Sequence, residues 1–168
     1  MTKIIAEIGW NHMGDMSLAK KMILAAKENG ADYVKTQIFD IKFLKDGPWM
    51  KDGRKEIYEK AQLSDEKYKE LLEYSNKIGI NFFTSIFNKD AAIRINKIQN
   101  DIIKIPSTES RNYDLIDYCN NNFNKVIIST GTSSEEELEN LKKNLKNENY
   151  IFLHCVSAYP CDPSIANL

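Results

Sequence analysis

The sequence predicts an α/β protein, a (β/α)8 barrel of the TIM type shortened to about six βα units. Three observations support this fold class. Short apolar runs rich in Ile, Val, Phe and Tyr alternate with helical patterns, the alternation continues along the chain, and polar residues follow the apolar runs. Strands separated by helices run parallel, because each crossover returns the chain to the same edge of the sheet. Polar groups at the C-terminal ends of such strands mark the active face of a barrel.

The strands are predicted where an apolar, β-branched run is short. They span residues 4–8, 33–37, 81–85, 102–105, 126–129 and 150–156. Helices are predicted where apolar residues recur at helical spacing. They span roughly residues 16–29, 64–78, 88–97, 112–122 and 134–146, so strands and helices alternate in the order βαβαβαβαβαβ.

Helix ends are signalled by capping residues. Ser64 stands before one helix, and Thr132 has a glutamate three residues later, as in a capping box. Gly30 and Gly79 stand where two helices should end. The triplet Asn120–Asn122 is interpreted as a solvated helix end.

Residues 38–63, between the second strand and its helix, are longer than an ordinary βα connection. The segment contains Trp49 and the turn-forming stretches Asp46-Gly47-Pro48 and Asp52-Gly53. Two interpretations stay open, an inserted surface loop and a lid over the site.

Composition limits the class of protein. The 168 residues are 42% hydrophobic, enough for one domain with its own core. The 23 basic and 24 acidic residues form no basic stripe, so nucleic acid and membrane are not expected partners. The chain shows no secretory signal, and three cysteines without a paired framework suit a reducing compartment, so a cytoplasmic location is expected.

Side-chain direction predicts the site. With a period of two, Lys35 and Gln37 point to the same side of their strand, which in a barrel is the interior. A buried lysine needs an anionic partner, either in a structural ion pair or in a ligand. Lys35 and Lys104, with nearby hydroxyl groups, suit a phosphate-bearing substrate. Glu7 is the carboxylate able to orient water or move a proton. The hydroxyl groups belong to Thr84, Ser107, Ser129 and Ser157.

The two histidines are weaker candidates. His12 lies in a polar loop after the first strand and could either touch substrate or hydrogen-bond the turn. His154 alternates with Leu153 and Cys155, which turns it away from the interior. No pair of histidines has the spacing of metal ligands, so no metal-binding residue is assigned.

Six motifs, in matching order, resemble the sialic acid synthase family, which includes N-acetylneuraminate, legionaminate and pseudaminate synthases. The resemblance covers essentially the whole chain. The motifs are AEIGWNHMGD at residues 6–15, VKTQ at 34–37, FTSIF at 83–87, KIPS at 104–107, STG at 129–131 and HCVSAYP at 154–160.

The resemblance implies a TIM-barrel transferase that condenses phosphoenolpyruvate with an N-acetylated hexose, releases phosphate and forms a nonulosonic acid. It implies a divalent manganese or magnesium ion and makes Glu7, Lys35 and Lys104 the catalytic residues. The implied ligands of phosphoenolpyruvate are Lys35, Thr84, Lys104, Ser107, Ser129 and Tyr159, and those of the sugar hydroxyls are Gln37 and Glu109. Ser157 departs from the family's pattern, which has asparagine there.

The resemblance further implies that residues 1–168 are an incomplete TIM-barrel synthase domain. The last two strands, with the histidines that bind metal, and a C-terminal antifreeze-like domain are absent. Such a fragment is expected to be inactive alone. Unpaired edges on its first and sixth strands would favour a homo-oligomer. Two alternatives stay open, another phosphoenolpyruvate aldol-type synthase similar to octulosonate phosphate synthase, and a non-catalytic phosphate-binding or interaction fragment.

Overall fold

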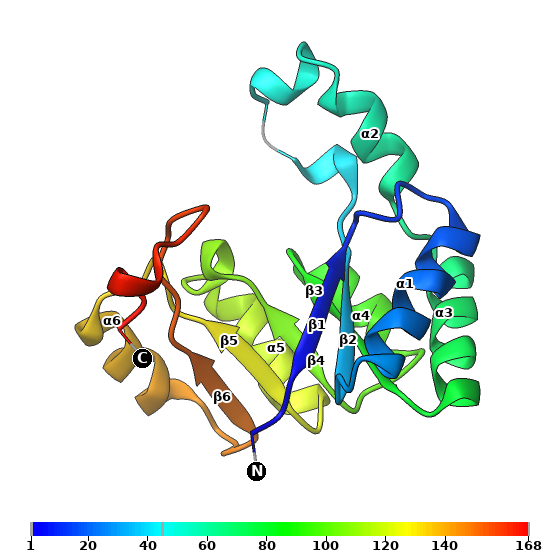
Figure 1. Ribbon diagram of the computed structural model, residues 1–168. Coiled ribbons are helices and arrows are strands. Elements are labelled where there is room, and N and C mark those ends of the chain that lie inside the picture. The colour runs from blue at the N-terminus through cyan, green and yellow to red at the C-terminus, as the bar shows by residue number, and fades with distance from the viewer. Residues whose placement is uncertain (1, 45, 168) are drawn as a thin grey trace. The chain divides into compact units, whose positions relative to one another are not determined.

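The computed structural model describes residues 2–44 and 46–167. The chain divides into two compact units, Met1–Ser85 and Ile86–Leu168. Six parallel strands alternate with helices, as Figure 1 shows, so the predicted α/β fold class is confirmed. Among the described residues, no helix has the length and apolar character needed to cross a membrane.

The first unit contains the strands β1 (Ile5–Gly9), β2 (Tyr33–Ile38) and β3 (Asn81–Ile86) with the helices α1 (Met16–Glu28) and α3 (Asp65–Ile78). β1 and β2 pair in parallel. α1 and α3 pack side by side. The buried side chains of α1 are Ala19 and Ile23, one turn apart, which gives the helix the single apolar stripe of a core-facing helix.

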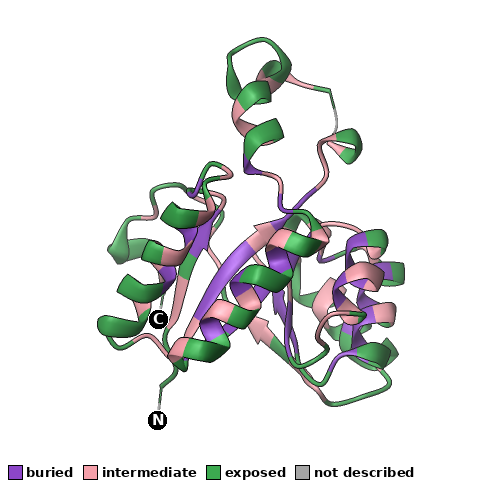
Figure 2. Ribbon diagram, turned by 90° about the vertical axis from the view of Figure 1, so that its right-hand side faces the viewer, coloured by how far each residue is buried: buried purple, intermediate pink, exposed green. Residues whose placement is uncertain are grey.

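The second unit contains α4 (Lys89–Asn96), β4 (Ile103–Ile105), α5 (Tyr113–Asn122), β5 (Val126–Ser129), α6 (Glu135–Asn144) and β6 (Tyr150–Leu153). β5 pairs in parallel with β4 on one side and with β6 on the other. The residues of β5 are buried on both faces, as expected for a parallel strand covered by helices. In Figure 2 buried residues concentrate on the strands, and the outward faces of the helices are exposed.

The sixth strand is shorter than predicted, since it ends at Leu153 and not at Val156. The register pairs Leu153 with Ser129, the last residue of β5, so the neighbouring strand offers no further backbone partners. The backbone N–H and hydroxyl of Thr130 both donate to the Leu153 carbonyl, at 3.1 and 2.8 Å, and close this end.

The segment between β2 and α3 is not a plain surface loop. It contains the 3-10 turns η1 (Ile41–Phe43) and η2 (Pro48–Met50) and the helix α2 (Arg54–Ala61). The sequence did not predict α2, because this helix is short and Ala61 is its only buried residue, so apolar residues do not recur at helical spacing. The segment lies beyond the C-terminal end of β2 (Figure 1).

Three predicted helix ends are confirmed and a fourth is wrong. Gly30 follows the last residue of α1, Glu28, and its C-cap Asn29, and has a positive φ of 82°. Ser64 caps α3 by accepting from the Lys67 N–H at 3.3 Å, and Gly79 ends it in the left-handed conformation. The capping box of α6, however, joins Ser134 to Glu137, not Thr132 to Glu135. The Thr132 hydroxyl instead donates to the Ser107 carbonyl.

The interpretation of the asparagine triplet as a solvated helix end is wrong for Asn120, which is 1% exposed. Its side-chain amide donates to the carbonyl of Asn147 at 2.9 Å, and its Oδ1 accepts from the N–H groups of Lys146 and Asn147 at 3.0 and 3.1 Å. Asn120 therefore supplies the hydrogen bonds that the α6–β6 turn does not make internally.

Asn120→Ala is expected to lower the free energy of unfolding by about 2–3 kcal/mol, because it leaves buried backbone groups of this turn without partners. Chemical denaturation measures the loss. The matched control is Asn121→Ala. Asn121 is exposed and its amide donates to the Asp117 carbonyl of its own helix at 2.8 Å, so a change within about 0.5 kcal/mol is expected. Equal losses in the two variants would contradict the role assigned to Asn120.

Candidate functional site

The first unit carries a charged pair where β1 and β2 lie side by side. The register sets Glu7 opposite Lys35, and the Lys35 ammonium forms an ion pair with the Glu7 carboxylate. The same ammonium donates to the Ser85 hydroxyl of β3 at 2.8 Å. Lys35 is 6% exposed, whereas the Glu7 side chain is 46% exposed, so the carboxylate is the accessible end of the pair.

Burial shifts the pKa of Lys35. It lowers the pKa of the ammonium below the usual 10.5, and the charge and hydrogen bond of Glu7 oppose this change without cancelling it. The desolvated ammonium is therefore stabilised by any additional anion placed beside it.

Gly9 lies beside the polar cluster of the first unit, which consists of Glu7, Lys35, Gln37 and Ser85. The pairing of β1 with β2 is irregular between Glu7 and Gly9, and Gly9 takes a positive φ of 53°. The Thr36 hydroxyl holds this bend by donating to the Gly9 carbonyl at 2.7 Å. A Cβ at Gly9 would lie 3.3 Å from Glu7 Oε1 and 3.5 Å from Gln37 Nε2. Glu7, Lys35 and Gln37 thus lie together, as predicted.

Thr84 and Ser85 have different places in this cluster. Thr84 is fully buried, and its hydroxyl donates to the Ser85 carbonyl at 3.0 Å. Successive residues of a strand point to opposite faces, and it is Ser85 that meets Lys35. Thr84 was predicted from the sequence as a site residue, whereas Ser85 was not. The only available signal was its position in the FTSIF motif.

The second unit contains a lysine–serine pair of its own. Lys104 on β4 donates to the hydroxyl of Ser129, the last residue of β5, at 2.5 Å. The register sets Lys104 opposite Ile127, so its side chain reaches one residue pair further toward the C-terminal end of β5. Ser129 is 5% exposed. This contact confirms that the two residues share a face, as the alternation predicts.

The loops after β4, β5 and β6 are joined through Gly131. Its N–H donates to the Ser107 hydroxyl at 3.2 Å, and its carbonyl accepts from the Ser157 hydroxyl at 2.7 Å. A Cβ at this position would lie 2.9 Å from Ser157 Oγ and 3.2 Å from the Cys155 carbonyl oxygen, so a larger residue would displace the Ser157 hydroxyl from its contact. Ser107 and Ser157 are thereby brought together around a residue that sequence analysis did not select.

Two predicted site residues lie apart from these contacts. The Glu109 carboxylate, at the end of the 3-10 turn η3 (Ser107–Glu109), accepts from the Asn112 amide at 2.9 Å. Tyr159 is 100% exposed, so the structure brings it into neither cluster.

Comparison with known protein families matches residues 22–168 to the NeuB family. The chain belongs to the NeuB family. It is 33% identical to the pseudaminic acid synthase of Helicobacter pylori and 34% identical to the N,N'-diacetyllegionaminic acid synthase of Campylobacter jejuni. These alignments cover 99% of the chain but 53% and 55% of the relatives. The NeuB-family chain thus spans about half the length of the curated relatives it matches, and the resemblance deduced from its six motifs is confirmed.

Solved structures support the same assignment. The N-acetylneuraminic acid synthetase of Leptospira borgpetersenii, crystallised with citrate, superposes with a TM-score of 0.84 at 32% identity, covering 98% of this chain and 57% of that one. A truncated 3-deoxy-D-arabino-heptulosonate 7-phosphate synthase of Thermotoga maritima gives a TM-score of 0.64 at 15% identity, over 89% of this chain and 50% of that one. The second likeness shows the fold alone. The predicted TIM-barrel class of the NeuB-family chain is confirmed.

His12 of the NeuB-family chain is a buried residue of the β1–α1 loop. Its Nδ1 accepts from the Gly14 N–H at 3.0 Å, which confirms the turn-binding interpretation and leaves the proton on Nε2. Nε2 is buried and has no hydrogen-bond partner among the residues that the structure describes. Burial, and secondly the charge of Lys67, lower the pKa of His12 below the usual 6.5, so the ring is held neutral.

The neutral state of His12 is expected to make folding stability depend on pH. As the pH falls below 6.5 the unfolded chain binds the proton first, so the free energy of unfolding decreases, by at most about 1.4 kcal/mol per pH unit. Urea unfolding at about pH 7.5 and about pH 5 tests this. His12→Gln should flatten the dependence, whereas His154→Gln, at an exposed position, should leave it unchanged. An identical slope in both variants would contradict the prediction.

The described part of the chain has no group of side chains that fits a metal ion. Within residues 2–44 and 46–167, no three His, Cys, Asp or Glu side chains gather closely enough to hold one. Burial also raises the pKa of the Cys119 thiol to about 12, which keeps it protonated and unsuited to metal binding. No chemical step is therefore derived through a metal.

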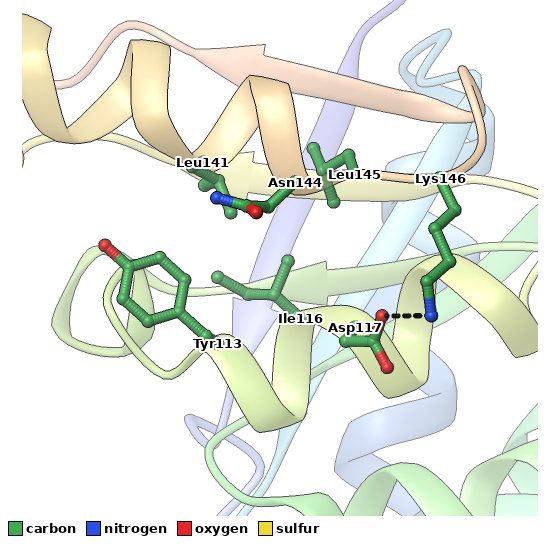
Figure 3. Close-up of a pocket in the computed structure, with 7 residues that line it drawn as sticks. All are labelled: Tyr113, Ile116, Asp117, Leu141, Asn144, Leu145 and Lys146. Carbon is green, nitrogen blue, oxygen red and sulfur yellow. Dashed lines mark ion pairs between the residues drawn. The ribbon is translucent and has the colours of Figure 1, made fainter.

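A pocket of about 450 Å³ opens between α5 and α6 of the second unit (Figure 3). Apolar side chains line it, and the ion pair between Asp117 and Lys146, at 3.3 Å, lies at one end. None of the predicted site residues lines this pocket, so it is distinct from the Lys35–Ser85 and Lys104–Ser129 pairs. Its lining consists of Tyr113, Ile116, Asp117, Leu141, Asn144, Leu145 and Lys146.

Proposed function

We propose that this chain carries the phosphoenolpyruvate-binding part of a nonulosonic acid synthase, an enzyme that condenses phosphoenolpyruvate with an N-acetylated hexose and releases phosphate. One observation in this NeuB-family chain carries the proposal. Each unit holds a strand lysine bonded to a serine hydroxyl near the C-terminal end of the neighbouring strand, as in Lys35 with Ser85 and Lys104 with Ser129. Ammonium and hydroxyl donors at such strand ends suit a phosphate-bearing anion.

In this proposal substrate binding breaks the ion pair between Glu7 and Lys35 and replaces it with an ion pair between Lys35 and the ligand. Phosphoenolpyruvate places an anionic group beside Lys35 in the first unit. Lys104, Thr84, Ser107, Ser129, Ser157 and Tyr159 stay ligands predicted from the resemblance to the family. Lys35 turns from the Glu7 carboxylate to the ligand and stays charged, because an anion again compensates its burial. Glu7, accessible and now unpaired, becomes available as a base.

The chemistry then follows from the substrates. The enol carbon of phosphoenolpyruvate forms a bond to the sugar aldehyde carbon, and water adds to the resulting cation. Glu7 accepts one proton of that water and passes it to the alkoxide formed from the aldehyde oxygen, which becomes a hydroxyl. The tetrahedral intermediate then breaks its C–O bond to phosphate, the departing phosphate takes the second water proton, and a 2-keto acid is left. Gln37 and Glu109 are predicted to bind the sugar hydroxyls.

Other parts of the proposal concern the protein at its natural length. A manganese or magnesium ion, assembly as a homo-oligomer, a cytoplasmic location and low activity of residues 1–168 alone remain predictions. Another phosphoenolpyruvate aldol-type synthase is the second candidate, favoured by fold alone through the likeness to the Thermotoga maritima enzyme.

The test measures phosphate release from phosphoenolpyruvate with a panel of N-acetylated hexoses and manganese, using the gene product at the length made in the cell. Mass spectrometry identifies the acid formed. A nonulosonic acid with one of the sugars supports the proposal. Release of phosphate only with sugar phosphates that lack an acylamino group would replace it with the second candidate. Calorimetry of phosphoenolpyruvate with residues 1–168 tests binding separately, and no heat of binding would contradict this part of the proposal.

A further inference from the structure

Three hydroxyl groups connect the loop after β4 with the loop after β5 in the second unit. The Thr132 hydroxyl donates to the Ser107 carbonyl at 2.5 Å, across 25 residues of sequence. The Ser133 hydroxyl donates to Ser110 Oγ at 2.7 Å, and the Ser110 hydroxyl donates to the same Ser107 carbonyl at 2.8 Å. Ser110, Thr132 and Ser133 are called the hydroxyl brace below. Ser110 is 3% exposed, so its bonds are shielded from water, whereas Thr132 is exposed and can be substituted without opening the core.

The hydroxyl brace acts on Ser107, the first residue of η3. The Ser107 carbonyl also accepts from the Ser110 N–H at 3.2 Å, which closes the 3-10 turn. The side chain of Ser107 meets the other loop, since its hydroxyl oxygen accepts from the Gly131 N–H at 3.2 Å. The two loops are thus bonded through both the backbone and the side chain of Ser107, which fixes the position of its hydroxyl oxygen.

These contacts also decide where the proton of the Ser107 hydroxyl can go. A serine hydroxyl has one O–H donor and two acceptor lone pairs. The Gly131 N–H occupies an acceptor position of Ser107 Oγ, and the Ser107 O–H meets no acceptor among the residues that the structure describes. The hydroxyl oxygen of Ser129 likewise accepts, from the Lys104 ammonium. The Ser107 proton is therefore left to donate to a bound anion.

We propose that Thr132 is a positioning residue, which through the hydroxyl brace holds the Ser107 hydroxyl ready to donate to phosphoenolpyruvate. The inference rests on the proposed function, in which Ser107 is a predicted ligand. Thr132 gives its own proton to a backbone carbonyl, so it acts through Ser107 and not on the ligand. A donor that is held in place before binding loses little freedom when the anion arrives, so the brace raises affinity without adding a contact.

Calorimetry of phosphoenolpyruvate with Thr132→Val and Thr132→Ser tests the positioning role. Valine keeps the shape of threonine without the hydroxyl, and serine keeps the hydroxyl without the methyl. Thr132→Val should weaken binding about tenfold, and Thr132→Ser should stay within about twofold of wild type. Wild-type affinity in Thr132→Val, or an equal loss in Thr132→Ser, would overturn the proposal.

The matched control is Ser75→Ala in α3 of the first unit. The Ser75 hydroxyl is buried and donates to the Leu71 carbonyl at 2.7 Å, so this variant also loses a bond from a hydroxyl to a backbone carbonyl. It should lower the free energy of unfolding and leave the affinity for phosphoenolpyruvate unchanged. A loss of affinity equal to that of Thr132→Val would show that lost stability alone weakens binding, and would overturn the positioning role.

A double-mutant cycle tests whether Thr132 acts through Ser107. Ser107→Ala removes the hydroxyl that the brace positions and should weaken phosphoenolpyruvate binding about tenfold or more. In that background Thr132→Val should cost less than about a further twofold, because the group it positions is gone. Losses that multiply in the double variant would overturn the proposal, since Thr132 would then affect the ligand by another route.

Amide hydrogen exchange at Gly131 tests the brace without any ligand. The Gly131 N–H donates to the Ser107 hydroxyl, so Thr132→Val should reduce its protection about fivefold or more, and Thr132→Ser should keep it. Unchanged protection in Thr132→Val would overturn the brace whatever the protein binds. Wild-type protein that binds no phosphoenolpyruvate would reject the proposed function and the positioning role with it, whereas equal binding by wild type and Thr132→Val rejects the positioning role alone.

Discussion

Lys35→Met is expected to weaken phosphoenolpyruvate binding by about 100-fold or more, because it removes a desolvated charge that we propose meets the ligand. Lys35 is 6% exposed, so water does not screen its attraction for an anion. Methionine keeps the length and apolar volume of the side chain, and the fold should persist. Calorimetry gives the affinity, and near-ultraviolet circular dichroism checks the packing.

The control for this experiment is Lys20→Met. Lys20 forms an ion pair with Glu70 at 2.6 Å, but both side chains are well exposed, at 34% and 48%. Exposed pairs contribute little, so affinity for phosphoenolpyruvate should be unchanged. Wild-type affinity in Lys35→Met would show that the ion pair with Glu7 is purely structural.

Glu7→Gln is expected to reduce turnover of the synthase about 10²- to 10⁴-fold, the usual contribution of a general base, while phosphoenolpyruvate still binds. Glutamine has the shape of glutamate but cannot accept the proton of the attacking water. Steady-state phosphate release measures the rate, and Glu70→Gln is the exposed control. Turnover within threefold of wild type would remove Glu7 from the mechanism.

The substitution Glu7→Gln is also expected to change how the affinity for phosphoenolpyruvate depends on pH. Glu7 opposes the effect of burial on Lys35, so without the carboxylate the pKa of Lys35 should fall further below 10.5. A neutral lysine does not attract an anion. Phosphoenolpyruvate affinity in Glu7→Gln should therefore decline at a lower alkaline pH than in the wild type, as a calorimetric titration series would show.

Much of the fold was predictable because its signals are local. The strands β3 and β5 are short, apolar and bounded by turns, and α3 begins at a serine and ends at a glycine. The errors have non-local causes. Thr132, Ser133 and Ser134 each precede a glutamate by three residues, so the sequence alone offers three equivalent capping boxes. The hydroxyls of Thr132 and Ser133 bond instead to the Ser107 carbonyl and the Ser110 hydroxyl, more than 20 residues away, and Ser134 is the cap.

The site was predictable to the extent that strand alternation decides it. Alternation and motif order placed Glu7, Lys35 and Gln37 together, and the geometry agrees. Strand alternation could not identify Ser85 or Gly131, because their contacts depend on how the ends of neighbouring strands are staggered. The substrate contacts assigned by resemblance, including that of the fully exposed Tyr159, stay predictions.

α2 contacts the β1–α1 loop through the rings of Tyr58 and Trp10 and through the close approach of Gly14 to the Lys60 carbonyl. This arrangement has a consequence for how the sequence can change. The charged residues Glu7 and Lys35 are fixed by the pairing of β1 with β2, whereas Trp49 and Tyr58 belong to a segment attached mainly by ring contacts and one glycine. Substitutions in that segment leave the strand register intact. The segment that carries α2 can therefore vary in sequence during evolution while the pairing of Glu7 with Lys35 is kept.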